Sequence, residues 1–235
     1  MRMMSKRSTQ KYASFTIGSS LELTNQQLKK LTRLFQIPVK TLGSGLIGRS
    51  SITISHLKGI GSVVVKHYTR GGFIRYFLKL HYLKWGRTRG ETEFKILQKA
   101  KQIGVSVPEP IAYAFEGGLF YKGWLVSKKI EEQQTLAKLA CDNEGRTFTV
   151  MENIIEQIAI LIDHKILHVD LHPGNILIDH ENRVFLIDFD KARISHKNRK
   201  MLTERYINRW RRAVIKHQLP KMLIETLDTG LSNHP

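Results

Sequence analysis

The stretch HVDLHPGNILID, residues 168–179, followed by VFLIDFD, residues 184–190, is the part of this sequence that indicates both fold and chemistry. The first segment has the spacing H-x-D-x-x-x-x-N and places Asn175 five residues after Asp170. The second places Asp188 eighteen residues after Asp170, at the end of a run that reads as a strand. Three such residues at fixed offsets, completed by D-F-D, rarely arise by chance.

This spacing predicts a site of phosphoryl transfer. Such a site needs one carboxylate near the attacking hydroxyl, together with an amide oxygen and a second carboxylate that hold metal ions against the phosphates. We predict Asp170 as the catalytic carboxylate and Asn175 with Asp188 as the ligands of Mg²⁺. Asp190, in the glycine position of D-F-G, receives no role.

The histidines and the cysteine of this region have simpler interpretations. His168 is expected to pack and hydrogen-bond within the loop rather than act as a base. His172 and His180 are expected at the surface. Cys141, the single cysteine, is expected to be inert, because no neighbouring residue suggests a catalytic dyad.

Upstream of this region, three glycines have the spacing G-x-G-x-x-G: Gly43, Gly45 and Gly48. In a dinucleotide-binding turn such glycines open a helix, whereas here the strand-like run SITIS, residues 51–55, follows them. SVVVK, residues 62–66, reads as the second strand of a hairpin. The order predicts a glycine loop laid over the phosphates of ATP, with Lys66 at the end of the second strand.

A glutamate on the next helix is expected to pair with Lys66. Residues 91–104 have helical periodicity and end at Gly104, a typical C-terminal cap. Glu93 is preferred over Glu91, because it directly precedes the core position Phe94. The segment 126–129 is the predicted hinge, where Ser127 and Lys128 offer backbone groups to adenine. The predicted nucleotide-binding residues are therefore Gly43, Gly45, Gly48, Lys66, Glu93, Ser127 and Lys128.

The organisation of the chain changes near residue 130. Before it, strands dominate, including a pair around Gly117 and Gly118; after it, residues 149–163 form an amphipathic helix. We predict an α+β, protein-kinase-like fold of two lobes around a cleft. Residues 1–130 are the expected ATP-binding lobe and residues 131–235 the expected catalytic and acceptor lobe.

Composition limits the class of protein. The 235 residues are 41% hydrophobic, which suits a globular protein, and the single cysteine excludes an internal disulfide. No secretory signal and no run long enough to cross a bilayer is recognised, so we expect a soluble or peripheral cytoplasmic protein. Most of the net charge of +18 lies in residues 61–90 and 191–217. Such concentration indicates an anionic partner.

The chain resembles the bacterial lipopolysaccharide core kinases, and most of all the 3-deoxy-D-manno-octulosonic acid (Kdo) kinases. The resemblance rests on five stretches: VVVKHYTRGGFIRYF, residues 63–77; RTRGETEFKILQKAKQIGVSVPEPIAY, residues 87–113; HVDLHPGNILID; VFLIDFDKARI, residues 184–194; and INRWRRAVIKH, residues 207–217. It implies a kinase-like fold, ATP and Mg²⁺, Asp170 as catalytic carboxylate and Lys66 on the phosphates. It also implies a sugar hydroxyl of the lipid A–core as acceptor, at the cytoplasmic face of the inner membrane.

Residue patterns support a non-protein acceptor independently. Only 47 residues follow Asp188 and no A-P-E occurs, which is too little for a peptide-binding lobe. The His172-Pro173-Gly174 sequence also occurs in aminoglycoside- and choline-kinase-like enzymes, so a small-molecule phosphotransferase stays an alternative. An RNA-associated atypical kinase or ATPase is a further one, although no RNA-binding module is recognised and nucleic acid is not an expected partner.

The basic stretches are predicted to hold the protein against an anionic membrane surface. Residues 73–85, if helical, place Arg75, Lys79 and Tyr82 on one stripe, opposite apolar residues. The segment 207–217 adds a second group of cations around Trp210: Arg209, Arg211, Arg212 and Lys216. The oligomeric state is left open.

Overall fold

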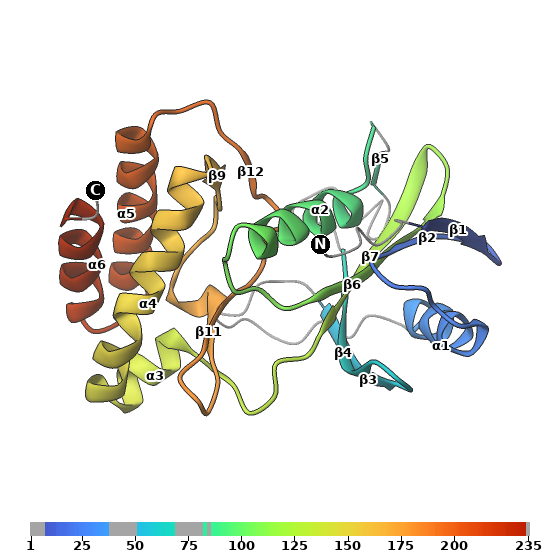
Figure 1. Cartoon of the computed structure of the whole chain (residues 1–235), viewed down its shortest axis with the longest axis horizontal. Helices are drawn as coiled ribbons and strands as arrows, with labels where there is room; N and C mark the ends of the chain where they lie inside the picture. The colour runs from blue at the N-terminus through green and yellow to red at the C-terminus, as the bar shows by residue number, and fades with distance from the viewer. Residues whose placement is uncertain (1–7, 38–50, 69–81, 84–85, 234–235) are drawn as a thin grey trace, which may run out of the picture. The chain divides into compact units, whose positions relative to one another are not determined.

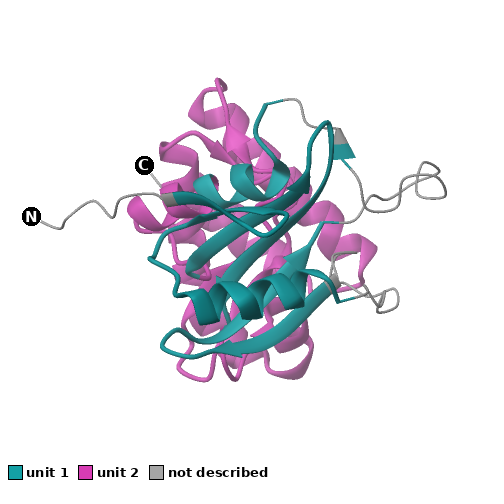
Figure 2. Ribbon diagram, turned by 90° about the vertical axis from the view of Figure 1, so that its right-hand side faces the viewer, with its two compact units in different colours: residues 1–95, 109–129 teal, residues 96–108, 130–235 magenta. Residues whose placement is uncertain are grey.

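The structure is a computed structural model that describes residues 8–37, 51–68, 82–83 and 86–233. A part rich in β-sheet comes first in the sequence, and most of the helices follow it (Figure 1). The chain divides into two compact units, residues 1–95 with 109–129 and residues 96–108 with 130–235 (Figure 2). Each unit is described by itself below.

Unit 1 is built on an antiparallel sheet, which has seven strands within the described residues, in the order β1-β2-β6-β7-β4-β3, with β5 also paired to β7. The strands are β1 (Ser8–Tyr12), β2 (Phe15–Ser19), β3 (Ser51–Leu57), β4 (Gly61–His67), β5 (Tyr82–Leu83), β6 (Pro110–Gly117) and β7 (Phe120–Lys128). The hairpin of β3 and β4 is confirmed, with Ile52 opposite Lys66. The strand pair around Gly117 and Gly118 is confirmed as β6 and β7.

The first two strands and the helix that follows them were not predicted from the sequence. Helix α1 (Asn25–Phe35) begins with a capping box, in which the Thr24 side chain accepts from the Gln27 backbone and the Gln27 side chain accepts from the Thr24 backbone. Its buried face packs into an aromatic core in which Phe35 stacks on Trp124 at 5.0 Å. This core supports one face of the sheet, the one away from Lys66.

Helix α2 (Arg89–Gln102) has the position predicted for it. Thr88 caps its start, because its hydroxyl accepts the backbone N–H of Glu91. Gly104 ends it with a φ of +94°, a left-handed conformation that glycine adopts without strain. The predicted helical cap at Gly104 is therefore confirmed.

Unit 2 is mainly helical. Its helices are α3 (Leu136–Asp142), α4 (Glu144–Asp163), the short 3₁₀ turn η2 (Pro173–Asn175), α5 (Arg199–Lys216) and α6 (Met222–Asn233). Its short strands are β8 (Gln134–Thr135), β9 (Ile166–Leu167), β10 (Ile176–Ile178), β11 (Val184–Leu186) and β12 (Arg193–Ile194). The predicted helix over 149–163 is confirmed as part of α4, whose apolar side is buried. The strand predicted before Asp188 is confirmed as β11, which pairs antiparallel with β10.

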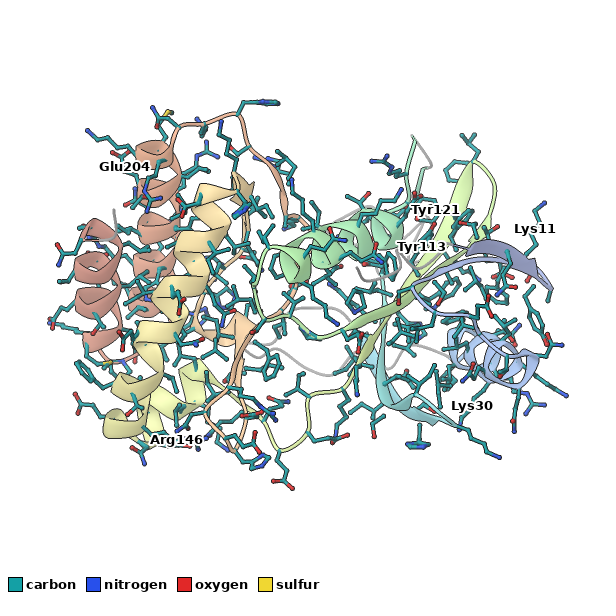
Figure 3. The ribbon with its side chains drawn as sticks, viewed as in Figure 1. Lys11, Lys30, Tyr113, Tyr121, Arg146 and Glu204 are labelled. Atoms are coloured by element: carbon teal, nitrogen blue, oxygen red, sulfur yellow. The ribbon has the colours of Figure 1, made fainter. Side chains whose placement is uncertain are left out.

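The helix considered for residues 73–85 does not extend to its end. Residues 73–81 lie outside the described part, but Tyr82 and Leu83 form β5 and pair with β7, where Tyr82 lies opposite Tyr121 (Tyr121 is labelled in Figure 3). Tyr82 is buried and its hydroxyl accepts from Arg89. Tyr82 is thus a packing residue of unit 1 and not part of an exposed stripe. Among the described helices, none combines the length and apolar character that a membrane span requires.

Candidate active site

In unit 1 the ammonium group of Lys66 is held by a buried carboxylate. The Nζ atom lies 2.9 Å from Oε2 and 3.0 Å from Oε1 of Glu93 on α2. The hydroxyl of Tyr68 donates to the same Oε2 at 2.5 Å. Glu93 is only 2% exposed, and a carboxylate at that depth requires such partners. Glu93, itself held by Tyr68, thus fixes the Lys66 ammonium on the sheet. Tyr68 was not predicted from the sequence, although it lies two residues after the lysine.

Glu91, the alternative partner of Lys66, forms other ion pairs. Its Oε1 lies 2.5 Å from Nζ of Lys95 and 3.7 Å from Nε of Arg87. Glu93, the preferred candidate, is the residue that contacts Lys66. The start of α2 approaches β7 so closely that a Cβ at Gly90 would lie 2.6 Å from the carbonyl oxygen of Trp124. Only glycine permits this approach, which brings Glu93 within reach of Lys66.

Apolar side chains accompany Lys66 on its face of the sheet. Ile52 pairs with Lys66, and Ile54 pairs with Val64, across β3 and β4. Directly opposed residues project on the same side of a sheet, as do residues two apart in one strand. Ile52 and Ile54 are 46% and 57% exposed, large fractions for isoleucine. The alternation of isoleucines in SITIS, residues 51–55, could have predicted that both project from one face of the sheet.

The predicted hinge residues belong to the end of β7. Ser127 lies opposite Val64 on one side and Pro110 on the other. The N–H of Lys128 donates to the carbonyl of Glu109, and the N–H of residue 129 donates to that of Ser62. Both backbone N–H groups therefore already have acceptors inside unit 1. The contact of Ser127 and Lys128 with adenine stays a prediction. The glycine loop, Gly43, Gly45 and Gly48, lies outside the described residues.

In unit 2 the carboxylate of Asp170 is partly exposed and is held by an arginine. Asp170 follows β9 and precedes η2. Arg209 on α5 donates from Nε to Oδ1 of Asp170 at 3.0 Å and from Nη2 to the same oxygen. The Asp170 side chain is 39% exposed. Its backbone carbonyl accepts from Nδ2 of Asn175 at 2.9 Å, which closes the loop between them.

His168 links this loop to the D-F-D segment. Its Nε2 lies 2.9 Å from the carbonyl oxygen of Ile187, and its ring packs on Phe189 at 4.5 Å. Burial lowers the pKa of His168 below its usual value, so the ring is neutral. Because a carbonyl only accepts, the proton lies on Nε2. The expected structural role of His168 is confirmed: it fixes the backbone just before Asp188.

The proposed metal ligands share this framework. The N–H of Ile187 donates to the backbone carbonyl of Asn175 at 3.0 Å, so the two segments that carry Asn175 and Asp188 are joined directly. Asp188 has a φ of +63°, a left-handed conformation that is uncommon outside glycine and recurs at functional sites. With its Nδ2 donated to Asp170, the Oδ1 of Asn175 is the atom suited to a cation.

The donor set fits Mg²⁺ bound together with phosphates. No group of three or more acidic, histidine or cysteine side chains that could hold a metal occurs within the described residues. Mg²⁺ is commonly held by one or two protein oxygens, with water and substrate phosphates completing its octahedron. One amide oxygen and one carboxylate meet that requirement.

His172 is buried, contrary to the expectation of a surface residue. Its Nδ1 accepts the N–H of Gly174 at 3.1 Å and caps η2. Burial, and the nearby charge of Arg209, lower the pKa of His172 to about 4. The sequence did not reveal this, because capping by histidine has no strong local pattern. His180 is exposed as expected, and Cys141 is exposed too.

The basic segment of α5 differs from its predicted role. Trp210 is buried and donates from Nε1 to the carbonyl of Leu223, so it is a core residue and cannot dock on a membrane. Arg209 contacts Asp170, and Arg211 pairs with Asp228. Arg212 and Lys216 are exposed. Trp210 therefore has no part in the predicted membrane contact, and two of the four cations predicted around it, Arg209 and Arg211, are engaged within unit 2.

These features are those of a kinase, with a lysine–glutamate pair in one unit and an H-x-D loop joined to D-F-D in the other. The chain belongs to the lipopolysaccharide kinase (Kdo/WaaP) family, whose sequence model matches residues 47–228. It is 35% identical over 161 residues to a 3-deoxy-D-manno-octulosonic acid kinase of Vibrio vulnificus, a match that covers 67% of each chain. It is 33% identical over 163 residues to the enzyme of that name from Vibrio parahaemolyticus, which covers 66% of this chain and 67% of the relative.

Proposed function

We propose that this protein is an ATP- and Mg²⁺-dependent kinase of protein-kinase-like, two-lobed fold, which phosphorylates a hydroxyl of Kdo linked to lipid A. In this proposal residues 1–130 bind the nucleotide and residues 131–235 carry the catalytic and acceptor groups. The observation that carries it is the joined framework of unit 2, in which His168 and Asn175 both hold Ile187 and so fix Asp170, Asn175 and Asp188 together.

The nucleotide is proposed to bind on the Lys66 face of unit 1. The Lys66 ammonium, oriented by Glu93 and Tyr68, contacts phosphate oxygens as a point charge. The exposed isoleucines of β3, together with Val64, offer an apolar surface to the purine. Contact with such side chains removes the faces of the purine ring from water and so favours binding. Gly43, Gly45 and Gly48 cover the phosphates, and Ser127 with Lys128 lies near the base.

The chemical step is assigned to Asp170. Asp170 accepts a hydrogen bond from the acceptor hydroxyl and orients its oxygen in line with the γ-phosphorus. It receives the hydroxyl proton as that oxygen bonds to the γ-phosphorus, the bond to the β,γ-bridging oxygen breaks and ADP leaves. Asn175 and Asp188 would hold Mg²⁺, which would supply positive charge to the phosphates. His168 keeps the Asp188 backbone in place and exchanges no proton.

Two arguments support Kdo linked to lipid A as the acceptor: the net charge of the protein and its similarity to Kdo kinases. Kdo is a carboxylated sugar and lipid A carries phosphates, so the acceptor is anionic and suits a protein of net charge +18. A cationic aminoglycoside would be repelled by the same charge. The relatives named above are Kdo kinases. A peripheral position at the cytoplasmic face of the inner membrane is part of this proposal, carried on α5 by exposed Arg205, Arg212 and Lys216.

The acceptor assignment is tested in cells. Lipopolysaccharide from cells with the gene, analysed by mass spectrometry, should carry one more phosphoryl group on the Kdo residue than lipopolysaccharide from cells without it. Complementation with the Asp170→Asn variant should not restore this group. A phosphate missing instead from heptose, or unchanged lipopolysaccharide, would overturn the assignment of Kdo.

The Lys66 site gives a prediction with an internal control. Glu93→Gln leaves the shape of the side chain but removes the charge that holds Lys66, so kcat/KM for ATP should fall about a hundredfold. Glu91→Gln, two residues away on the same helix, breaks only partly exposed ion pairs with Lys95 and Arg87 and should change kcat/KM little. Steady-state kinetics of both variants measure this. An equal loss in both variants would show that α2 as a whole, and not the Lys66–Glu93 contact, matters.

A further inference from the structure

The contact between Arg209 and Asp170 has a geometry that leaves one carboxylate oxygen open. Both donating nitrogens of Arg209, Nε and Nη2, are directed at Oδ1. Within the described residues, Oδ2 of Asp170 accepts no hydrogen bond from the protein. The two side chains are 28% and 39% exposed, so the pair lies where a solute can reach it.

Helix α5 is fixed to the catalytic loop one turn before Arg209. The hydroxyl of Tyr206 donates to the carbonyl of Ile166 at 2.8 Å and accepts the N–H of His168 at 2.8 Å. Tyr206 is 2% exposed, and burial raises its pKa, so its hydroxyl stays protonated as this bond requires. Residues three apart on a helix lie on the same side. Tyr206 and Arg209 therefore hydrogen-bond the segment 166–170 from one face of α5.

The loop itself provides no cation beside Asp170. The residue two positions after Asp170 is His172, which is buried, caps η2 and is neutral at neutral pH. Phosphoryl transfer benefits from a fixed positive charge near the reacting groups, and from a base whose orientation is fixed before the substrate arrives. The positive charge that contacts Asp170 is supplied by α5, 39 residues further along the chain.

We propose that Arg209 is the positioning residue of the catalytic carboxylate: it holds Oδ1 of Asp170 so that Oδ2 is directed toward the acceptor hydroxyl. This inference rests on the proposed function, because it takes Asp170 as the residue that receives the proton. The planar guanidinium donates two bonds to one oxygen and so fixes the rotation of the carboxylate, which a lysine ammonium cannot do equally well.

The test compares two arginines of the same helix. Arg209→Gln should lower kcat about thirtyfold, within the range that misplacement of a reacting group causes, and leave the KM for acceptor, the Kd for an ATP analogue and the Tm near wild type. Arg211→Gln breaks an ion pair with Asp228 on α6 and should leave kcat unchanged. Arg209→Lys should fall between wild type and Arg209→Gln. Guanidinium chloride, far below denaturing concentrations, should partly restore kcat of Arg209→Ala.

Each other outcome overturns this inference. A wild-type kcat in Arg209→Gln would show that the contact has no effect on the reaction. A raised acceptor KM with unchanged kcat would make Arg209 a residue that binds an anionic group of the acceptor instead. A folded Arg209→Ala that guanidinium does not rescue, with Arg209→Lys equally inactive, would indicate a structural role. Asp170→Asn separates failure of the proposed function from failure of this inference. If Asp170→Asn is active, the proposed function fails. If Asp170→Asn is inactive while Arg209→Gln is fully active, only the positioning role of Arg209 fails.

Discussion

Asp170→Asn should reduce phosphoryl transfer by at least about a hundredfold, because the variant cannot accept the proton of the acceptor hydroxyl. The substitution keeps the shape of the side chain, and the Asn175 side chain still bonds the backbone carbonyl of residue 170. The partly exposed position of Asp170 makes a large loss of stability unexpected. Initial rates with saturating ATP and acceptor measure the effect, and the Kd for a non-hydrolysable ATP analogue should stay close to that of wild type.

Asp163→Asn is the matched control for this change. Asp163 is also a partly exposed carboxylate of unit 2 and also pairs with an arginine, Arg199. It lies in α4 and has no assigned role, so its removal should leave the rate almost unaffected. A well-folded Asp170→Asn protein with more than about one hundredth of the wild-type rate would contradict the assignment of the catalytic carboxylate.

Asp188→Asn should also abolish transfer, for a different reason. Asp188 is the only carboxylate in the proposed pair of Mg²⁺ ligands, and replacing it by an amide weakens the attraction for a hard cation. The apparent Kd for Mg²⁺ in the presence of ATP should therefore rise as kcat falls. Titration of activity with Mg²⁺ measures both quantities.

Asp190→Asn is the comparison for Asp188, because the two carboxylates flank Phe189 in the same D-F-D segment. Asp190 has no assigned role, and Asp190→Asn should keep the Mg²⁺ dependence of wild type. If Asp190→Asn raised the Mg²⁺ requirement and Asp188→Asn did not, the assignment of the metal ligand to Asp188 would be wrong.

Much of the fold of each unit could be predicted from local patterns. The hairpin of β3 and β4, helix α2 with its glycine cap and the strands β10 and β11 all have strong periodicity or turn signals. The order of lysine, glutamate and H-x-D loop indicated a glutamate partner for Lys66, and the position directly before Phe94 favoured Glu93, which contacts Lys66 in the structure. Helix α1 could have been found too, since Thr24 and Gln27 have capping-box spacing before Leu28 and Leu31.

The misses concern contacts between segments far apart in the sequence. A cation-rich helix has many possible phases, and nothing local shows that Arg209 faces Asp170 while Trp210 faces α6. Burial of His172 depends on the same packing. Tyr82 pairs with β7 although its neighbours suggested an amphipathic helix, because pairing with a strand can override weak periodicity. Tertiary contacts decided each of these cases.

The most direct measurement is transfer by the purified protein to two acceptors that differ only in Kdo. With ATP and Mg²⁺, mass spectrometry should show one added phosphoryl group on lipid A that carries Kdo, and none on lipid A without it. The product should be absent with Asp170→Asn. Phosphorylation of lipid A lacking Kdo, or transfer to an aminoglycoside and not to the Kdo-bearing lipid, would contradict the proposed function.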